Sequence, residues 1–78
     1  MRGLTAFDYY RKLRLRIIEM GMLHDEVAKR IGRSKGYFSE RITGKKAWDQ
    51  DDIRALAKLL DIPPSEWLSY FFEKEAAA

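Results

Sequence analysis

Three glycines and a proline pair divide this chain into helical segments, and the two segments between Gly21 and Gly44 are too short to be stable alone. Gly21, Gly32 and Gly44 each end a run of apolar residues at helical spacing, and Pro63-Pro64 end a fourth. Glycine commonly terminates helices, and proline cannot continue one. Isolated helices shorter than about 12–15 residues are marginal in water. The segments between Gly21 and Gly44 must therefore be held by packing on the rest of the chain.

Apolar periodicity predicts a compact, all-α domain of five helices. Apolar residues recur every three or four positions within each segment, as in amphipathic helices, and no stretch alternates as a strand does. Ser34 and Asp49 stand where N-caps belong, and Thr5 with Asp8 resembles a capping box. The expected helices are about Thr5–Met20, His24–Ile31, Lys35–Thr43, Asp49–Leu60 and a fifth that begins near Pro64 and carries the aromatic residues up to Phe72.

We expect a single domain over residues 1–78, with a frayed tail from 73 to 78. Its core should consist of the apolar residues on one side of each helix. They are Phe7, Tyr10, Leu13, Ile17, Met20, Val27, Ala28, Ile31, Phe38, Ile42, Ile53, Leu56, Ala57 and Leu60. We expect Trp48 and Trp67 to be core residues as well.

Composition excludes several classes of function. The chain has no cysteine and one histidine, so disulfides, thiolate metal sites and histidine clusters are ruled out. No nucleophile–base pair or phosphate-binding loop stands out, and we expect neither an enzyme nor a cofactor. No apolar run approaches the ~20 residues of a membrane span, and residues 1–7 lack a signal-peptide pattern. These features predict a cytoplasmic protein that contacts neither a membrane nor a small-molecule substrate.

Positive charge is concentrated in the first two thirds of the sequence. The formal net charge is +3. Between Arg11 and Lys46 there are eleven Lys or Arg and four Asp or Glu, whereas acidic residues outnumber basic ones from Ala47 onward. A basic face of this kind suits a polyanionic partner.

The segment from His24 to Thr43 carries the strongest functional pattern. Ala28 is small enough for two helices to approach closely, Gly32 follows four residues later, and Phe38 follows six residues after that. A left-handed backbone at the turn costs residues other than glycine about 1–2 kcal/mol. This spacing is typical of a helix-turn-helix.

With the five-helix arrangement, the chain resembles the lambda-repressor-like (Cro/XRE) helix-turn-helix family, and within it the small phage and prophage regulators. The matching stretches are Leu13–Glu19, Glu26–Gly32, Ser34, Phe38–Ser39, Ile42–Lys46, Trp48–Ile53, Leu56–Ile62 and Tyr70–Phe72. The resemblance implies a transcriptional regulator, such as a Cro-like repressor, that binds double-stranded DNA. Its recognition helix, at about residues 35–43, would enter the major groove.

The resemblance also implies which residues contact DNA. Base contacts fall to Lys35, Gly36, Tyr37 and Glu40, with Lys35 suited to guanine and Glu40 to cytosine. Phosphate contacts fall to Arg14, Arg16, His24, Ser34, Ser39, Thr43, Lys45 and Lys46. Plainer interpretations stay open: Glu40 forms an ion pair with Lys35 or Arg41, the two loop lysines are solvated, and so are Lys29, Arg30 and Arg33.

Three positions depart from the family pattern. Leu23 and His24 replace the usual Thr and Gln at the start of the second helix, which weakens the expected cap and one phosphate contact. Thr43 replaces an Asn, and Arg33 replaces an apolar residue after the turn glycine. None of them removes a core residue that the fold needs.

Tyr70, Phe71 and Phe72 form a cluster that cannot all face one side of a helix. Because one recognition helix reads little sequence, we expect a homodimer, formed free or on DNA, in which these three residues contribute subunit contacts. The alternative function is a protein-interaction module, such as an antitoxin or antirepressor, in which DNA binding is secondary.

Overall fold

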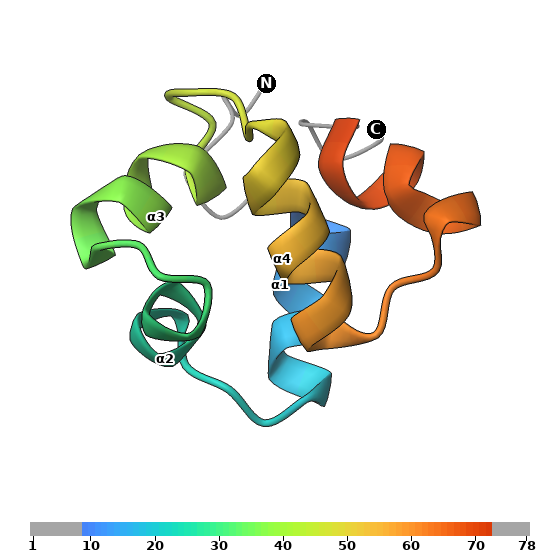
Figure 1. Ribbon diagram of the computed structural model, residues 1–78, viewed down its shortest axis with the longest axis horizontal. Coiled ribbons are helices and arrows are strands. Elements are labelled where there is room, and N and C mark those ends of the chain that lie inside the picture. Colours follow the sequence, from blue (N-terminus) through green and yellow to red (C-terminus); the bar gives the residue numbers. More distant parts are fainter. Residues whose placement is uncertain (1–8, 73–78) are drawn as a thin grey trace, which may run out of the picture.

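The computed structural model describes residues 9–72, which form helices joined by short turns (Figure 1). The helices are α1 (Arg11–Glu19), α2 (His24–Arg30), α3 (Lys35–Ile42) and α4 (Gln50–Leu60), followed by a 3₁₀ turn, η2 (Pro64–Glu66), and a wider π-helical turn, η3 (Leu68–Phe72). No β-strand occurs within this range, and the predicted all-α fold is confirmed. Residues 73–78, for which a frayed tail is expected, lie outside the described residues.

The first helix begins later than predicted. Tyr10 has φ 50° and ψ 42°, a left-handed conformation that cannot continue a right-handed helix, and α1 starts at the next residue. The predicted helix from Thr5 is therefore wrong across Tyr10, while Thr5, Phe7 and Asp8 lie outside the described residues. The Tyr10 ring is buried and meets the Trp48 ring edge-on, with 5.8 Å between centroids. Burial of this aromatic ring offsets the backbone strain.

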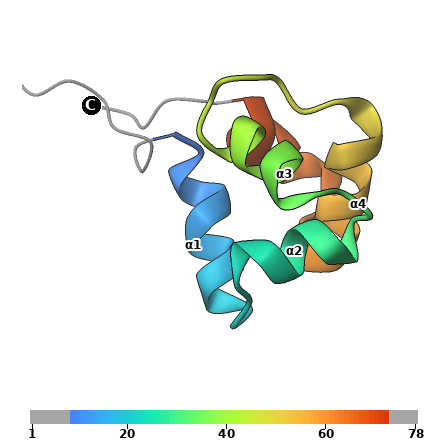
Figure 2. The same ribbon diagram turned by 90° about the vertical axis from the view of Figure 1, so that its left-hand side faces the viewer.

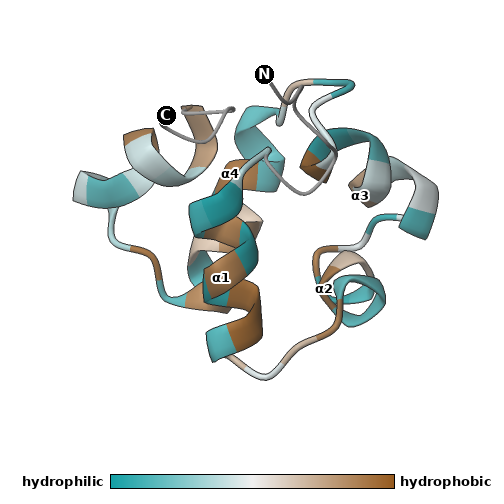
Figure 3. Cartoon of the chain, turned by 180° about the vertical axis from the view of Figure 1, so that it is seen from behind, coloured by the Kyte–Doolittle hydropathy of each residue, from teal (hydrophilic) through white to brown (hydrophobic). Residues whose placement is uncertain are grey.

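The core forms where α1 and α4 face each other and where α2 and α3 pack beside them. Figure 2 shows α1 and α4 on opposite sides, with α2 and α3 near the viewer. The predicted stripe of α4 is buried along its length, and Leu13 and Ile17 of α1 are fully buried. The predicted core positions Met20 and Ile31 are exposed and half-buried, respectively. Apolar residues of α1 and α4 appear in brown in Figure 3, where the chain is seen from behind.

Helix ends follow the predicted local signals. Ser34 accepts a hydrogen bond from the Tyr37 amide at 3.1 Å, and Asp49 with Asp52 forms a reciprocal capping box. Gly32 has φ +75°, as the turn requires. The end of α4 differs, because Asp61 takes the left-handed C-cap conformation two residues before the prolines. Asp tolerates this conformation better than most residues other than glycine.

The C-terminal segment packs unevenly. Phe71 is 3% exposed and belongs to the core, whereas Leu68 and Phe72 are 67% and 61% exposed. Phe71 is therefore not available for the subunit contact predicted from the sequence. Trp67 is half-buried, and its indole N–H donates to the Ile62 carbonyl at 3.2 Å. No helix within the described residues is long and apolar enough to span a bilayer.

Replacing Gly32 with alanine is expected to lower the free energy of unfolding by about 1 kcal/mol. A Cβ at Gly32 would meet no atom within 4 Å, so the cost comes from the left-handed backbone alone. Gly36→Ala is the matched control, because Gly36 lies inside α3 with equally open surroundings. There alanine is expected to raise the free energy of unfolding by about 0.5–1 kcal/mol. Urea denaturation measures the free energy of unfolding of both variants. A change of the same sign in the two variants would contradict a cost that comes from the left-handed backbone at Gly32.

Candidate nucleic-acid interface

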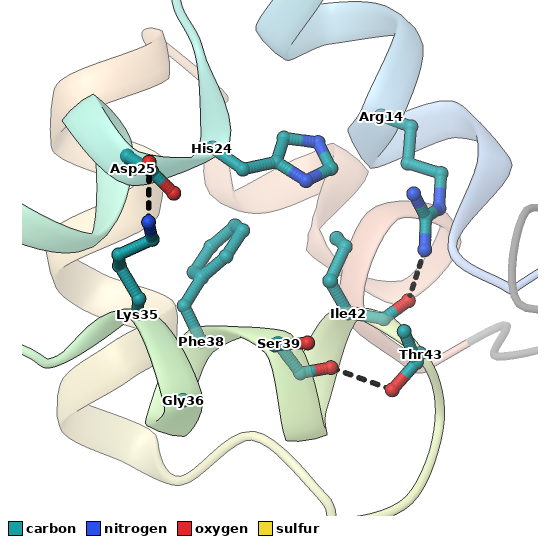
Figure 4. A pocket seen from close by; sticks show the side chains of 9 residues that line it. All are labelled: Arg14, His24, Asp25, Lys35, Gly36, Phe38, Ser39, Ile42 and Thr43. Carbon is teal, nitrogen blue, oxygen red and sulfur yellow. Dashed lines mark hydrogen bonds and ion pairs between the residues drawn. The ribbon is translucent and has the colours of Figure 1, made fainter.

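A shallow groove runs between α3 and the start of α2, with one residue of α1 at its edge (Figure 4). Its lining combines four of the eight predicted phosphate contacts and two of the four predicted base contacts with buried side chains. The lining residues are Arg14, His24, Asp25, Lys35, Gly36, Phe38, Ser39, Ile42 and Thr43. The fold thus brings together residues separated by up to 29 positions in the sequence.

The first turn of α3 leaves its outer side open. Lys35, Gly36 and Ser39 are exposed, and nothing lies within 4 Å of a Cβ placed on Gly36. The Lys35 ammonium lies 3.0 Å from Asp25, but both side chains are largely exposed. An exposed ion pair of this kind contributes little, so Lys35 can reorient toward a ligand at small cost.

The loop after α3 is held by backbone hydrogen bonds. The amides of Lys45 and Lys46 both donate to the carbonyl of Glu40, at 2.9 and 3.1 Å. The Glu40 carboxylate pairs with Lys46 at 3.4 Å and with Arg41 at 3.6 Å. The ion pair with Arg41 is one of the alternatives drawn from the sequence. The Thr43 hydroxyl donates to the Ser39 carbonyl, which orients it toward its own helix.

Two predicted phosphate ligands instead bind carbonyls at helix ends. Arg14 donates through Nε to Tyr9 O and through Nη2 to Ile42 O, both at 2.8 Å. Arg16 donates to Leu60 O at 2.8 Å. Ile42 and Leu60 are the last residues of α3 and α4, so cations at these two carbonyls satisfy unpaired acceptors and interact favourably with the helix dipoles. Tyr9, by contrast, lies just before α1. Partial burial also lowers the pKa of Arg14.

His24 lies half-buried at the centre of the groove (Figure 4). Its ring meets Phe38 edge-on at 5.3 Å between centroids. Burial lowers the pKa of His24, and the nearby positive charge of Arg14 lowers it further, whereas Asp25 raises it. The ring is therefore neutral at pH 7, and it acts as a hydrogen-bonding group with no formal charge.

Tyr37 faces α4, whereas the sequence predicts an outward base contact. Its hydroxyl donates to the carboxylates of Asp52 at 2.6 Å and Asp49 at 3.3 Å. Two guanidinium groups lie over its ring, that of Arg33 at 4.5 Å and that of Arg41 at 3.5 Å from the centroid. The hydrogen bond to Asp52 is the main reason that the pKa of Tyr37 is raised.

Arg33 completes the same arrangement. Its Nε donates to Asp52 at 2.9 Å, and a terminal nitrogen reaches Asp49 at 3.4 Å. Asp52 is 1% exposed, so its charge needs these partners. Arg33, Tyr37, Asp49 and Asp52, here termed the Asp52 network, join the turn before α3, α3 itself and the start of α4. The hydrogen bond of the Asp52 amide to Asp49 also lowers the pKa of the Asp49 carboxyl.

Sequence reasoning assigned Arg33 to solvent and missed this network. A usable signal was present: Asp52 immediately precedes Ile53 and is four residues before Leu56, on the buried stripe of α4. A carboxylate there requires a cation, and Arg33 stands where the resembled family has an apolar residue. No cluster of potential metal ligands was found within the described part of the chain.

A family model for a protein of unknown function, DUF739, matches residues 5–74. The chain belongs to the DUF739 family. No curated protein matches it. The match spans nearly the whole chain, so the Asp52 network and the groove both lie within the DUF739 region.

Removing the buried carboxylate is expected to destabilise this DUF739 domain. Asp52→Ala removes the nearer acceptor of both Arg33 and Tyr37, leaving them only the longer contacts to Asp49. It should lower the free energy of unfolding by about 2–4 kcal/mol. Tyr37→Phe should lower the free energy of unfolding by about 1–2 kcal/mol, because the hydroxyl contacts to Asp52 and Asp49 are lost and the ring is kept.

Asp51→Ala is the control for the loss of a negative charge at the start of α4. Asp51 is exposed, and the loss of its dipole interaction should cost less than about 1 kcal/mol. Equal effects of Asp51→Ala and Asp52→Ala in thermal unfolding would show that the Asp52 network is unimportant.

Proposed function

We propose that this DUF739 chain is a non-catalytic transcriptional regulator that binds double-stranded DNA sequence-specifically, as in the Cro/XRE family that it resembles. In this proposal α2, the turn around Gly32 and α3 are the helix-turn-helix, and α3 enters the major groove. The observation that carries the proposal is the open outer side of α3 on a helix that is fixed elsewhere. In its most specific form, the proposal is a Cro-like repressor of phage type that acts in the cytoplasm on the nucleoid.

Fixation of α3 supports recognition because bases are read within narrow distance limits. Ser34 caps the start of α3, Asp52 binds Tyr37 on the side facing α4, and Arg14 binds the carbonyl of Ile42 at its end. A helix held at three points loses little conformational entropy when it binds. Lys35 and Glu40 remain the proposed base-reading side chains, and Gly36 permits close approach of the backbone.

Phosphate contacts then fall to groups around the groove. The proposed ligands are His24, Ser34, Ser39, Lys45 and Lys46. The amides at the start of α3 add donors directed toward the same side. Arg14 and Arg16 are assigned to helix ends in this proposal, with their charges adding to the field of the basic face.

Fluorescence anisotropy with a labelled duplex from the DNA flanking the gene tests this function. If the basic face neutralises about four to eight phosphates per dimer, log K should fall with log salt at a slope of roughly −4 to −7. Lys46→Ala should reduce the slope by about one per monomer on every sequence, whereas Lys35→Ala should change preference at one base position per half-site.

Lys58→Ala is the matched control, since Lys58 is an exposed lysine on α4. A slope near zero, or equal effects of Lys46→Ala and Lys58→Ala, would count against DNA binding through α3.

The proposal includes a homodimer on two half-sites about 34 Å apart. The C-terminal segment offers exposed Leu68 and Phe72 for the subunit contact, while Tyr70 is half-buried beneath the ammonium group of Lys12. Phe72→Ser should lower cooperativity on a two-half-site duplex and leave helicity and single-half-site affinity unchanged. Sedimentation velocity checks the assembly, and a monomer on the full duplex would refute the dimer.

A further inference from the structure

The outer side of α1 and the turn after it expose several large apolar residues. Ile18 is 68% exposed, Leu23 76%, Leu15 52% and Met20 41%; Leu68 and Phe72 are the other large apolar residues exposed to this degree between residues 9 and 72. Single exposed apolar residues are normal, but exposed apolar residues that share one concave surface, as Leu15 and Ile18 do, mark an interaction site. Figure 3 shows the molecule from the α1 side.

A groove follows this apolar surface. Leu15 and Ile18, three residues apart on α1, line it together with Arg11, Arg14 and His24. All polar side chains of the lining are therefore basic residues, and two helices, α1 and α2, contribute to it. Such a concave surface accepts a protruding side chain better than it accepts a flat bilayer.

The charge around this groove indicates whether it binds a second copy of this chain or a different protein. Among the residues that the structure describes, the groove is lined by two arginines, Arg11 and Arg14, and by no carboxylate. The other two cations of α1 are engaged elsewhere, Lys12 with Glu66 and Arg16 with the Leu60 carbonyl. Two copies joined through α1 would bring like charges together, which is unfavourable. An occupant with carboxylates beside its apolar residues would be attracted to the same rim.

We propose that the α1 groove, formed by Arg11, Arg14, Leu15, Ile18 and His24, binds an acidic, amphipathic helix of another protein. The partner's apolar side chains would lie on Leu15 and Ile18, and its Asp or Glu residues would face Arg11 and Arg14. This is the helix-in-groove mode of recognition.

The position of the α1 groove gives it a regulatory consequence, which rests on the proposed function. Arg14 and His24 line both the α1 groove and the groove beside α3 (Figure 4). An acidic partner bound there places carboxylates close to the DNA phosphates. It should therefore weaken DNA binding.

Binding of a synthetic peptide to the full chain tests the proposal without DNA. The probe is a helical peptide of about 14 residues with leucines at helical spacing and glutamates flanking them; in matched peptides lysine replaces glutamate, or serine replaces leucine. Amide NMR shifts should map the glutamate peptide to α1 and the start of α2. Both matched peptides should bind at least about tenfold more weakly.

Ile18→Ser should weaken the glutamate peptide about tenfold, and Leu15→Ser should act similarly. Lys58→Ser is the control, because Lys58 is exposed on α4 and belongs neither to the α1 groove nor to the proposed subunit contact; it should leave the affinity for the glutamate peptide unchanged. Circular dichroism confirms that each variant is folded. Addition of the glutamate peptide to a protein–DNA complex should release DNA in the wild type but not in Ile18→Ser.

Three results would overturn the proposal. The first is equal binding of the glutamate and lysine peptides. The second is binding of anionic phosphatidylserine vesicles that depends on Ile18, with no binding of the peptide. The third is conversion of a dimer to a monomer by Ile18→Ser. Peptide binding is measured on the protein without DNA. If the protein does not bind DNA, the peptide result still shows whether the α1 groove binds an acidic helix, so the two proposals can fail separately.

Discussion

The arrangement of this domain depends on one buried carboxylate. Asp52 accepts hydrogen bonds from Arg33, Tyr37 and the Asp49 amide, and it is shielded from solvent by the elements that supply them. An unpaired carboxylate at this depth would cost several kcal/mol, so α4 and the turn before α3 must meet in the observed geometry. The interaction is directional where apolar packing is not, and it thereby fixes how α3 lies against α4.

The same arrangement separates stability from recognition within α3. Phe38 and Ile42 face the core, and Tyr37 faces α4, so the residues that hold the helix lie on its inner sides. Lys35 and Ser39 are exposed on the outer side, and their side chains contribute little to the stability of the fold. Changes to the outer side can therefore alter the proposed DNA preference at little cost to the fold, which is the property expected of a recognition helix.

His24 and Arg14 connect the two surfaces proposed to bind partners. Arg14 binds the end of α3 and also lines the apolar groove on α1, while His24 packs on Phe38 between the two. A ligand at either groove contacts residues of the other, so coupling needs no large conformational change. This arrangement would allow a chain of 78 residues to respond to a protein partner through direct overlap of the two proposed sites.

The sequence by itself determined the helices between Gly21 and Leu60, the N-caps of α3 and α4 and the apolar stripe of α4, because these depend on residues within about four positions of one another. It could not determine the most distant partners of Arg14, Arg16 and Arg33, which lie 28, 44 and 19 residues away. Long cationic side chains reach many acceptors, and only the packed tertiary structure selects one. The same holds for adjacent Phe71 and Phe72: local spacing treats them alike, and the turn of the C-terminal segment against α1 buries one and exposes the other.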